Sequence, residues 1–265
     1  MSDIDPAQSV HTRIWQEEPE PDNPFAARAA YCRGFDVFGQ MVGRARWIEM
    51  LVLLFRDELP DTPALDMLEA LAVALANPGP RDASVHAAMC GGVGGSTAAA
   101  ALIAALSVGA GRSGGARDVF DAIHAWSACG MDIEAWGRGG RPEDASVIDV
   151  WPQREHAPGF DPHGASTATT VRQLLQALAE IVATPRLCWL RDHRPELESA
   201  VGLPLAISGV AAAALADLGF SAEEGEMLYL LLRLPGAAAH ALEQSAHGFK
   251  RFPFYSIELE DDPRK

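Results

Sequence analysis

The sequence predicts a nearly all-helical protein, and three observations support that fold class. Apolar residues recur at helical spacing along most of the 265-residue chain. The alternation that is typical of strands occurs only in 252–259, and weakly. Capping residues, prolines and glycine pairs separate the helical stretches. The predicted class is all-α, with an irregular segment at 137–164 that is rich in glycine, proline and charge.

Four helices are predicted in the first half of the chain, at about 48–59, 62–77, 85–111 and 116–129. One apolar face marks the first, through Ile48, Leu51, Val52, Phe55 and Leu59. The second begins at a cap followed by Pro63 and ends at Asn77-Pro78-Gly79. Glycines between 91 and 95 interrupt the third or delay its start. The pair Gly114-Gly115 precedes the fourth.

Three more helices are predicted in the second half, at about 171–182, 205–218 and 222–244. The first of them is amphipathic and ends before Pro185. Ser221 with Glu224 forms a capping box that opens the last one. Pro235 lies inside that last helix and is expected to kink it, freeing a carbonyl near Leu231.

Composition excludes several classes of function. The formal net charge is −15, so most of the surface repels nucleic acid and anionic lipid, and no partner of either kind is expected. The uncharged stretch 87–111 is long enough to span a bilayer, but alanine and glycine dominate it, which favours a buried helix. The acidic start lacks a signal peptide, and the four cysteines form no CxxC pair, so we expect free thiols in the cytoplasm.

Local motifs are weak when each is taken alone. No histidine spacing matches a metal site, and no glycine cluster matches a nucleotide-binding loop, so neither a metal nor a nucleotide cofactor is predicted. Arg112, in a glycine-rich turn before a helix, is a candidate anion site. Lys250 and Arg251, among aromatic residues, could contact phosphate and adenine or could form a solvated tail.

A spaced motif near the C-terminus, R-x-x-G-x-x-x-H-x-x-E, consists of Arg233, Gly236, His240 and Glu243. Upstream, His86 follows Pro80 by six residues, and the glycine-rich segment 111–116 follows His86 at a spacing that matches a known family without insertion or deletion. The segments 33–37 and 55–61 resemble two N-terminal sequence motifs of the same family. Over about 12–263 the chain therefore resembles the citrate synthase superfamily, and most of all citryl-CoA lyase, including the lyase domain at the end of ATP-citrate lyase.

The resemblance implies a large helical domain, 1–115 with 203–265, and a small domain, 116–202, with the active cleft between them. It also implies a homodimer with a helical interface. The implied ligands are an acyl-CoA, which is a substrate and not a permanently bound cofactor, and a small carbonyl compound or carboxylic acid.

The implied chemistry forms or cleaves a C–C bond next to a CoA thioester through an enolate. A carboxylate takes the α-proton while histidines polarise the carbonyl groups. His86 matches one histidine position of the family. Arg233 matches a position that is associated with the substrate carboxylate or with CoA, and Arg112, Lys250 and Arg251 complete the expected binding set.

Three departures from the family pattern bear on that chemistry. Ser208 replaces the aspartate that serves as the base, and Ala206 replaces the asparagine before it. A second histidine is expected within 157–166, where Asp161, Pro162 or His163 could occupy its place. The arginine that would hold a keto acid is missing, because Arg172 is displaced from its position.

Three hypotheses remain open. In the first, the chain is an enzyme in which His86 stabilises the enolate, Asp161 replaces the missing base, and His163 lies in the same site. The second is a catalytically degenerate homologue that binds CoA esters or pairs with an intact paralogue. In the third, Ser208 and His86 hydrolyse an acyl-CoA.

Overall fold

The computed structural model describes residues 11–138, 156–253 and 255–257, and it is mainly helical, which confirms the predicted fold class. The chain forms two compact units, Met1–Glu69 and Ala70–Lys265. The division into a large domain of 1–115 with 203–265 and a small domain of 116–202 stays a prediction.

The first unit contains a small antiparallel sheet, which the sequence analysis did not predict. Its strands, in the order β1-β2-β3, are β1 (Gln16–Pro19), β2 (Ala27–Cys32) and β3 (Phe35–Asp36). Arg33 and Gly34 form the turn between β2 and β3, and both have positive φ, as a two-residue hairpin turn requires. A π-helical turn (Val37–Met41) and α1 (Trp47–Phe55) follow, and Cys32, Met41 and Leu53 form the buried core of this unit.

The remaining elements are helical, and their bounds are close to most of the predicted ranges. They are α2 (Thr62–Leu75), α3 (Ala83–Val93), α4 (Ala98–Gly109), α5 (Ala116–Cys129), α6 (Ile133–Gly137), α7 (Thr169–Ile181), α8 (Pro185–Val201), α9 (Ile207–Asp217), α10 (Ala222–His247) and a 3-10 helix (Phe249–Arg251). The described residues of the weakly alternating stretch 252–259, namely 252, 253 and 255–257, form no strand.

The uncharged stretch 87–111 is divided between two helices. A turn ends α3, and the hydroxyl of Thr97 then caps α4 by accepting from Ala100 N–H. Both helices pack with α10 around a core of small side chains, among them Ala88, Ala101 and Ala241. Within the described part of the chain, no helix is both long and apolar enough to cross a membrane.

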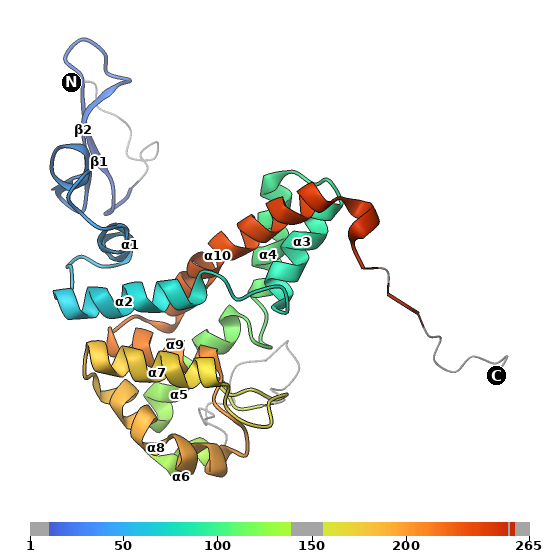
Figure 1. The fold of residues 1–265 in the computed structure, drawn as a ribbon. Helices are drawn as coiled ribbons and strands as arrows, with labels where there is room; N and C mark the ends of the chain where they lie inside the picture. Colours follow the sequence, from blue (N-terminus) through green and yellow to red (C-terminus); the bar gives the residue numbers. More distant parts are fainter. Residues whose placement is uncertain (1–10, 139–155, 254, 258–265) are drawn as a thin grey trace. The chain divides into compact units, whose positions relative to one another are not determined.

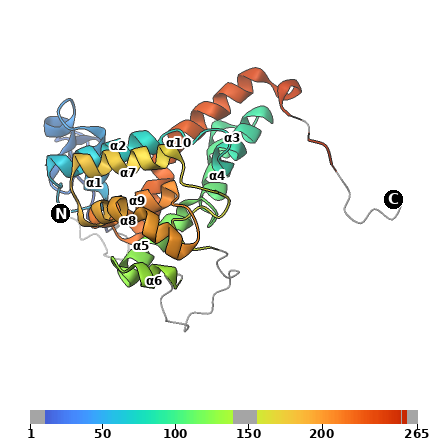
Figure 2. The ribbon, with the colours of Figure 1, turned by 60° about the horizontal axis from the view of Figure 1, so that its bottom comes forward.

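Helix α9 is the central element of the second unit. It contacts α5, α7, α8 and α10, and these neighbours surround it in Figures 1 and 2. Every side of its middle is buried, from Ser208 to Leu215. Four consecutive alanines, 211–214, keep its diameter small, so its neighbours approach closely. A polar residue on α9 is consequently surrounded by protein.

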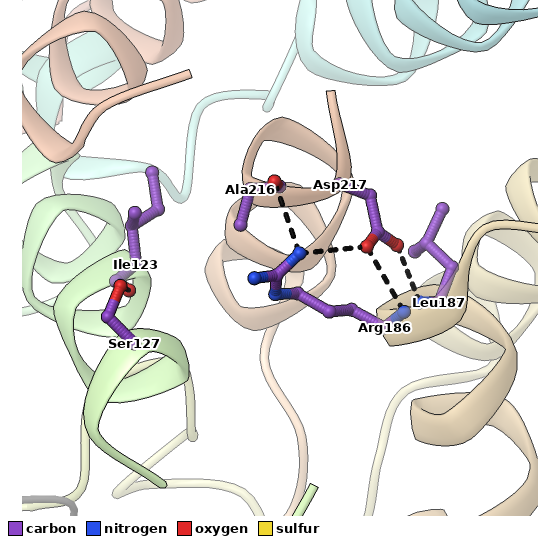
Figure 3. A network of polar contacts seen from close by, with 6 residues as sticks. All are labelled: Ile123, Ser127, Arg186, Leu187, Ala216 and Asp217. Carbon is purple, nitrogen blue, oxygen red and sulfur yellow. Dashed lines mark hydrogen bonds and ion pairs between the residues drawn. The ribbon is translucent and has the colours of Figure 1, made fainter. Parts of the chain in front are cut away.

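Two helices, α6 and α8, were not predicted. Pro185 was interpreted only as the end of the preceding helix, whereas it is also the first residue of α8. Thr184 occupies the N-cap position of α8, but its side chain accepts no hydrogen bond from the helix. Instead the carboxylate of Asp217, the last residue of α9, accepts from the N–H groups of Arg186 and Leu187 at 3.1 and 3.0 Å (Figure 3). The guanidinium of Arg186 also binds this carboxylate, at 3.1 Å.

Asp217→Ala is expected to destabilise the second unit by about 2–3 kcal/mol, because it removes a helix cap together with the buried partner of a half-buried ion pair. Chemical denaturation followed by circular dichroism measures the change. Asp192→Ala is the matched control, since Asp192 pairs with Arg191 on the exposed face of α8 and is expected to contribute less than about 1 kcal/mol. Equal effects of the two substitutions would contradict the capping role of Asp217.

Candidate functional site

A buried carboxylate, that of Asp118 in the first turn of α5, is the centre of the candidate site. Its Oδ2 accepts a hydrogen bond from Ser208 Oγ at 2.5 Å, and its Oδ1 accepts from Gly159 N–H at 3.1 Å. The Nε2 atom of His156 lies 3.9 Å from Oδ1. Asp118 is 4% exposed and Ser208 only 1%. The site therefore brings together α5, α9 and the segment 156–160.

Two glycines bring the segment 156–160 against α9. Gly159 has a φ of +83°, and a Cβ on it would lie 2.8 Å from the Cα of Gly209. A Cβ on Gly209 would in turn overlap the carbonyl oxygen of Gly159. The backbones also share hydrogen bonds, from Ala206 N–H to Gly159 O at 3.0 Å and from Asp161 N–H to Pro204 O at 2.8 Å. This backbone contact holds the Gly159 N–H in position to donate to Asp118.

A cluster of aromatic side chains includes Phe160, which directly follows Gly159 in the chain. Trp126 makes edge contacts with Trp136 and Trp189, and Trp136 makes one with Phe160. Burial raises the pKa of the Asp118 carboxyl above its usual value, and the nearby Asp121 adds to the rise. The hydrogen bonds from Ser208 and Gly159, together with His156, oppose the shift. Asp118 is thus a stronger base than an exposed aspartate when it is ionised.

Of the four residues predicted to be catalytic, Ser208 alone lies in this cluster. Asp161 is half-buried and directly follows the segment 156–160 in the chain. Its Oδ1 accepts a hydrogen bond from the N–H of His163 at 2.9 Å, which is the geometry of a capped turn. His163 itself is exposed. His86 lies on α3, with its ring centroid 5.9 Å from that of Phe252. Within the described residues, the Ser208 hydroxyl donates to Asp118 and makes no hydrogen bond to His86.

The residues predicted to bind CoA lie in different environments. Arg112 is half-buried in the turn before α5, whereas Lys250 and Arg251 are exposed in the 3-10 helix that follows α10. Phe252 comes directly after that 3-10 helix and contacts His86. The two exposed cations are therefore on a segment that packs against the predicted catalytic histidine.

The C-terminal motif attaches α10 to the segment that leads into α3. The guanidinium of Arg233 pairs with Asp82, the N-cap of α3, and also reaches Gly114 O at 3.5 Å. Gly236 N–H donates to Ala76 O at 2.7 Å, next to the kink that Pro235 was predicted to cause. The imidazole of His240 is 3.0 Å from Asn77 Oδ1. Spacings of three and four residues place these groups on one face of α10, which holds the segment 76–82.

Asp118 and His156 were not predicted from the sequence. A signal for Asp118 was present, because Asp118 and Asp121 fall on the apolar face of a predicted helix, among the buried residues Ala116, Val119 and Ala122. Charged residues are rarely buried without partners, so such a position indicates either a paired or a functional carboxylate. We find no comparable signal for His156, which lies in the irregular middle segment.

Comparison with known proteins identifies the fold. No family model and no curated protein sequence matches the chain. Among solved structures, citryl-CoA lyase from Hydrogenobacter thermophilus superposes with a TM-score of 0.70 at 20% identity, over 97% of this chain and 99% of that one. The fold is that of citryl-CoA lyase. This result confirms the resemblance predicted from the C-terminal motif and from His86.

Two further structures extend the citryl-CoA lyase comparison. ATP citrate lyase from Methanothrix soehngenii, in complex with citrate and coenzyme A, gives a TM-score of 0.69 at 18% identity over 98% of this chain, which spans 44% of that longer one. Citrate synthase from Thermoplasma acidophilum, in a ternary complex with carboxymethyl coenzyme A and oxaloacetate, gives 0.51 at 13% identity over 82% of this chain and 58% of that one. The fold of this chain is thus also similar to those of ATP citrate lyase and citrate synthase.

Proposed function

We propose that this chain binds CoA thioesters and forms or cleaves a C–C bond next to the thioester through an enolate. The observation that carries this proposal is the buried carboxylate of Asp118, hydrogen-bonded to Ser208, in a citryl-CoA lyase fold. Solved proteins of this fold hold coenzyme A together with citrate, or carboxymethyl coenzyme A together with oxaloacetate. The second reactant is proposed to be a small carbonyl compound or carboxylic acid.

The proposed chemistry needs both a base and a hydrogen-bond donor. The α-proton of a thioester is weakly acidic, so the negative charge that forms on the enolate oxygen must be stabilised while the proton leaves. We assign the donor role to His86, which is half-buried and packs against Phe252. Lys250 and Arg251, which are exposed on the adjoining 3-10 helix, supply positive charge for the phosphates of CoA, together with Arg112.

Exchange of α-protons tests this proposal. Proton NMR of acetyl-CoA and propionyl-CoA in deuterated water should show loss of the α-proton signal in the presence of the protein. The His86→Ala variant should exchange more slowly by about 10²-fold or more, the usual contribution of a positioned donor or general acid–base group. If neither acyl-CoA exchanges or shows broadened lines, the assignment to CoA thioesters fails.

One observation favours a second candidate, a catalytically degenerate protein that binds CoA esters or pairs with an active paralogue. Position 208 carries a hydroxyl that already donates to a carboxylate, and a neutral hydroxyl is not a base near neutral pH. In the same NMR experiment, this candidate predicts broadened acyl-CoA lines without exchange of the α-proton.

We also propose that the chain is a homodimer in the cytoplasm, with α4 at the interface. α4 has no charged residue, and its Ile103 side chain is 61% exposed. Light scattering should give about twice the monomer mass of 28.3 kDa. Ile103→Glu should lower that mass toward the monomer, whereas Gln176→Glu, on the exposed face of α7, should leave it unchanged. A monomeric wild-type protein would contradict the proposal.

A further inference from the structure

We propose that the carboxylate of Asp118 is the base that removes the α-proton, and that it replaces a carboxylate at position 208. This inference rests on the proposed function and names the group that carries out its first step. Asp118 Oδ2 lies 2.5 Å from Ser208 Oγ, one hydrogen bond from the side chain at position 208. The carboxylate thus comes from α5, although it reaches the start of α9.

The structure favours Asp118 over Asp161, the replacement base predicted from the sequence. The Asp161 carboxylate accepts from the N–H of His163, two residues away, and a Cβ on Gly164 would lie 2.8 Å from its Oδ2. It therefore caps its own turn. Asp118, by contrast, is held by groups from two distant parts of the chain: Ser208 on α9, and Gly159 with His156 in the segment 156–160. Such support fixes the position of a carboxylate as a base requires.

The three side chains at the centre of the site are all largely buried. The His156 side chain is 11% exposed, compared with 4% for Asp118 and 1% for Ser208. Of these three side chains, His156 is therefore the most exposed. Among the described residues, Asp121 on α5 and the buried Tyr229 on α10 are further titratable groups that interact with Asp118.

The step conserves atoms and charge without any other reactant. The C–H bond at the α-carbon breaks, and its proton forms an O–H bond on the Asp118 carboxylate. The electron pair of the C–H bond becomes the C–C π bond of the enolate, and the carbonyl π electrons move onto the thioester oxygen. In deuterated water Asp118 exchanges its proton with solvent and returns a deuteron to the α-carbon.

The inference can be tested by removing the carboxylate at position 118 and introducing one at position 208. The exchange of the acetyl-CoA α-protons is then measured by NMR as above. Asp118→Asn should slow exchange by about 10²-fold or more, the usual contribution of a general base. Asp161→Asn is the matched control and should change the rate less than about threefold, since a group outside the proton transfer contributes little to it. Combining Asp118→Asn with Ser208→Asp returns a carboxylate to α9 and should restore most of the lost rate. Calorimetric titration with CoA monitors binding in each variant.

The Ser208→Ala variant provides a second test, which does not depend on whether the Asp118→Asn variant folds. Ser208→Ala removes a hydrogen bond that lowers the pKa of Asp118, so the acid limb of the exchange rate should move to higher pH. A base elsewhere in the chain would leave that limb in place, which would overturn the inference.

The outcomes separate this inference from the proposed function. If the wild-type protein exchanges the α-proton and the Asp118→Asn variant does so at a similar rate, the inference is overturned but the proposed function stands. Exchange that is lost in Asp161→Asn and kept in Asp118→Asn assigns the base to Asp161. Binding of CoA without exchange in the wild-type protein refutes the enzymatic function, and the inference with it.

Discussion

Gly209→Ala is expected to destabilise the second unit by about 2–3 kcal/mol and to abolish most of the proposed exchange activity. Alanine is favoured over glycine inside a helix by about 1 kcal/mol, so propensity alone would predict a gain. The added Cβ, however, would overlap Gly159 O and lie 2.8 Å from Leu205 Cδ1. Gly159 O is a backbone atom that accepts a hydrogen bond from Ala206 N–H, so it cannot move away as the end of a flexible side chain can. The free-energy cost of overpacking therefore exceeds the gain in helix propensity.

Denaturation with urea measures the change in stability, and the NMR exchange rate measures the effect on the site. Gly111→Ala is the matched control, since Gly111 is exposed and an added Cβ would meet only Val108 O, at 3.3 Å. It should change stability by less than about 1 kcal/mol, as is usual for surface positions. If Gly209→Ala were as stable as the wild-type protein, the close approach of Gly159 and Gly209 would be wrong.

Arg233→Met is expected to destabilise the second unit by about 3 kcal/mol, near the lower end of the range for a broken buried ion pair. Arg233 is 5% exposed, packs over the ring of Tyr229, and joins α10 to Asp82 and Gly114. Methionine replaces most of the volume but not the charge. The loss is moderated because Asp82 keeps its hydrogen bonds from Ser84 and Val85 at the start of α3.

Thermal and urea denaturation should show this loss, and Arg191→Met is the control, because Arg191 pairs with its neighbour Asp192 on the surface. That control should cost less than about 1 kcal/mol. Weaker CoA binding by Arg233→Met without any loss of stability would instead indicate that Arg233 leaves Asp82 to bind the ligand directly.

Local signals predicted most of the helices correctly. α5 begins directly after the glycine pair, and α10 begins at the predicted capping box of Ser221 and Glu224. These signals act between residues within one turn of each other, so they can be recognised in a sequence. α8 was missed because its cap, Asp217, comes from another helix. The strands of the first unit were missed because they are short and one of them is bulged.

The candidate site was predicted only in part, for a related reason. Ser208, His86 and Arg233 were selected because they occupy positions in spaced motifs. Asp118 was not selected, because its contact with Ser208 joins residues 90 positions apart. The role of Asp161 as the base stays a prediction, and in the structure its Oδ1 accepts from the N–H of His163.

The sequence by itself thus determined the helical class, most helix boundaries and the resemblance to citryl-CoA lyase, because periodicity, capping and motif spacing are properties of neighbouring residues. Only the tertiary structure decided which carboxylate lies beside Ser208, which residue caps α8, and which groups Arg233 and His240 contact. Those pairings depend on how closely helices approach. The approach is set by glycines such as Gly159 and Gly209, whose missing side chains matter only after the chain has packed.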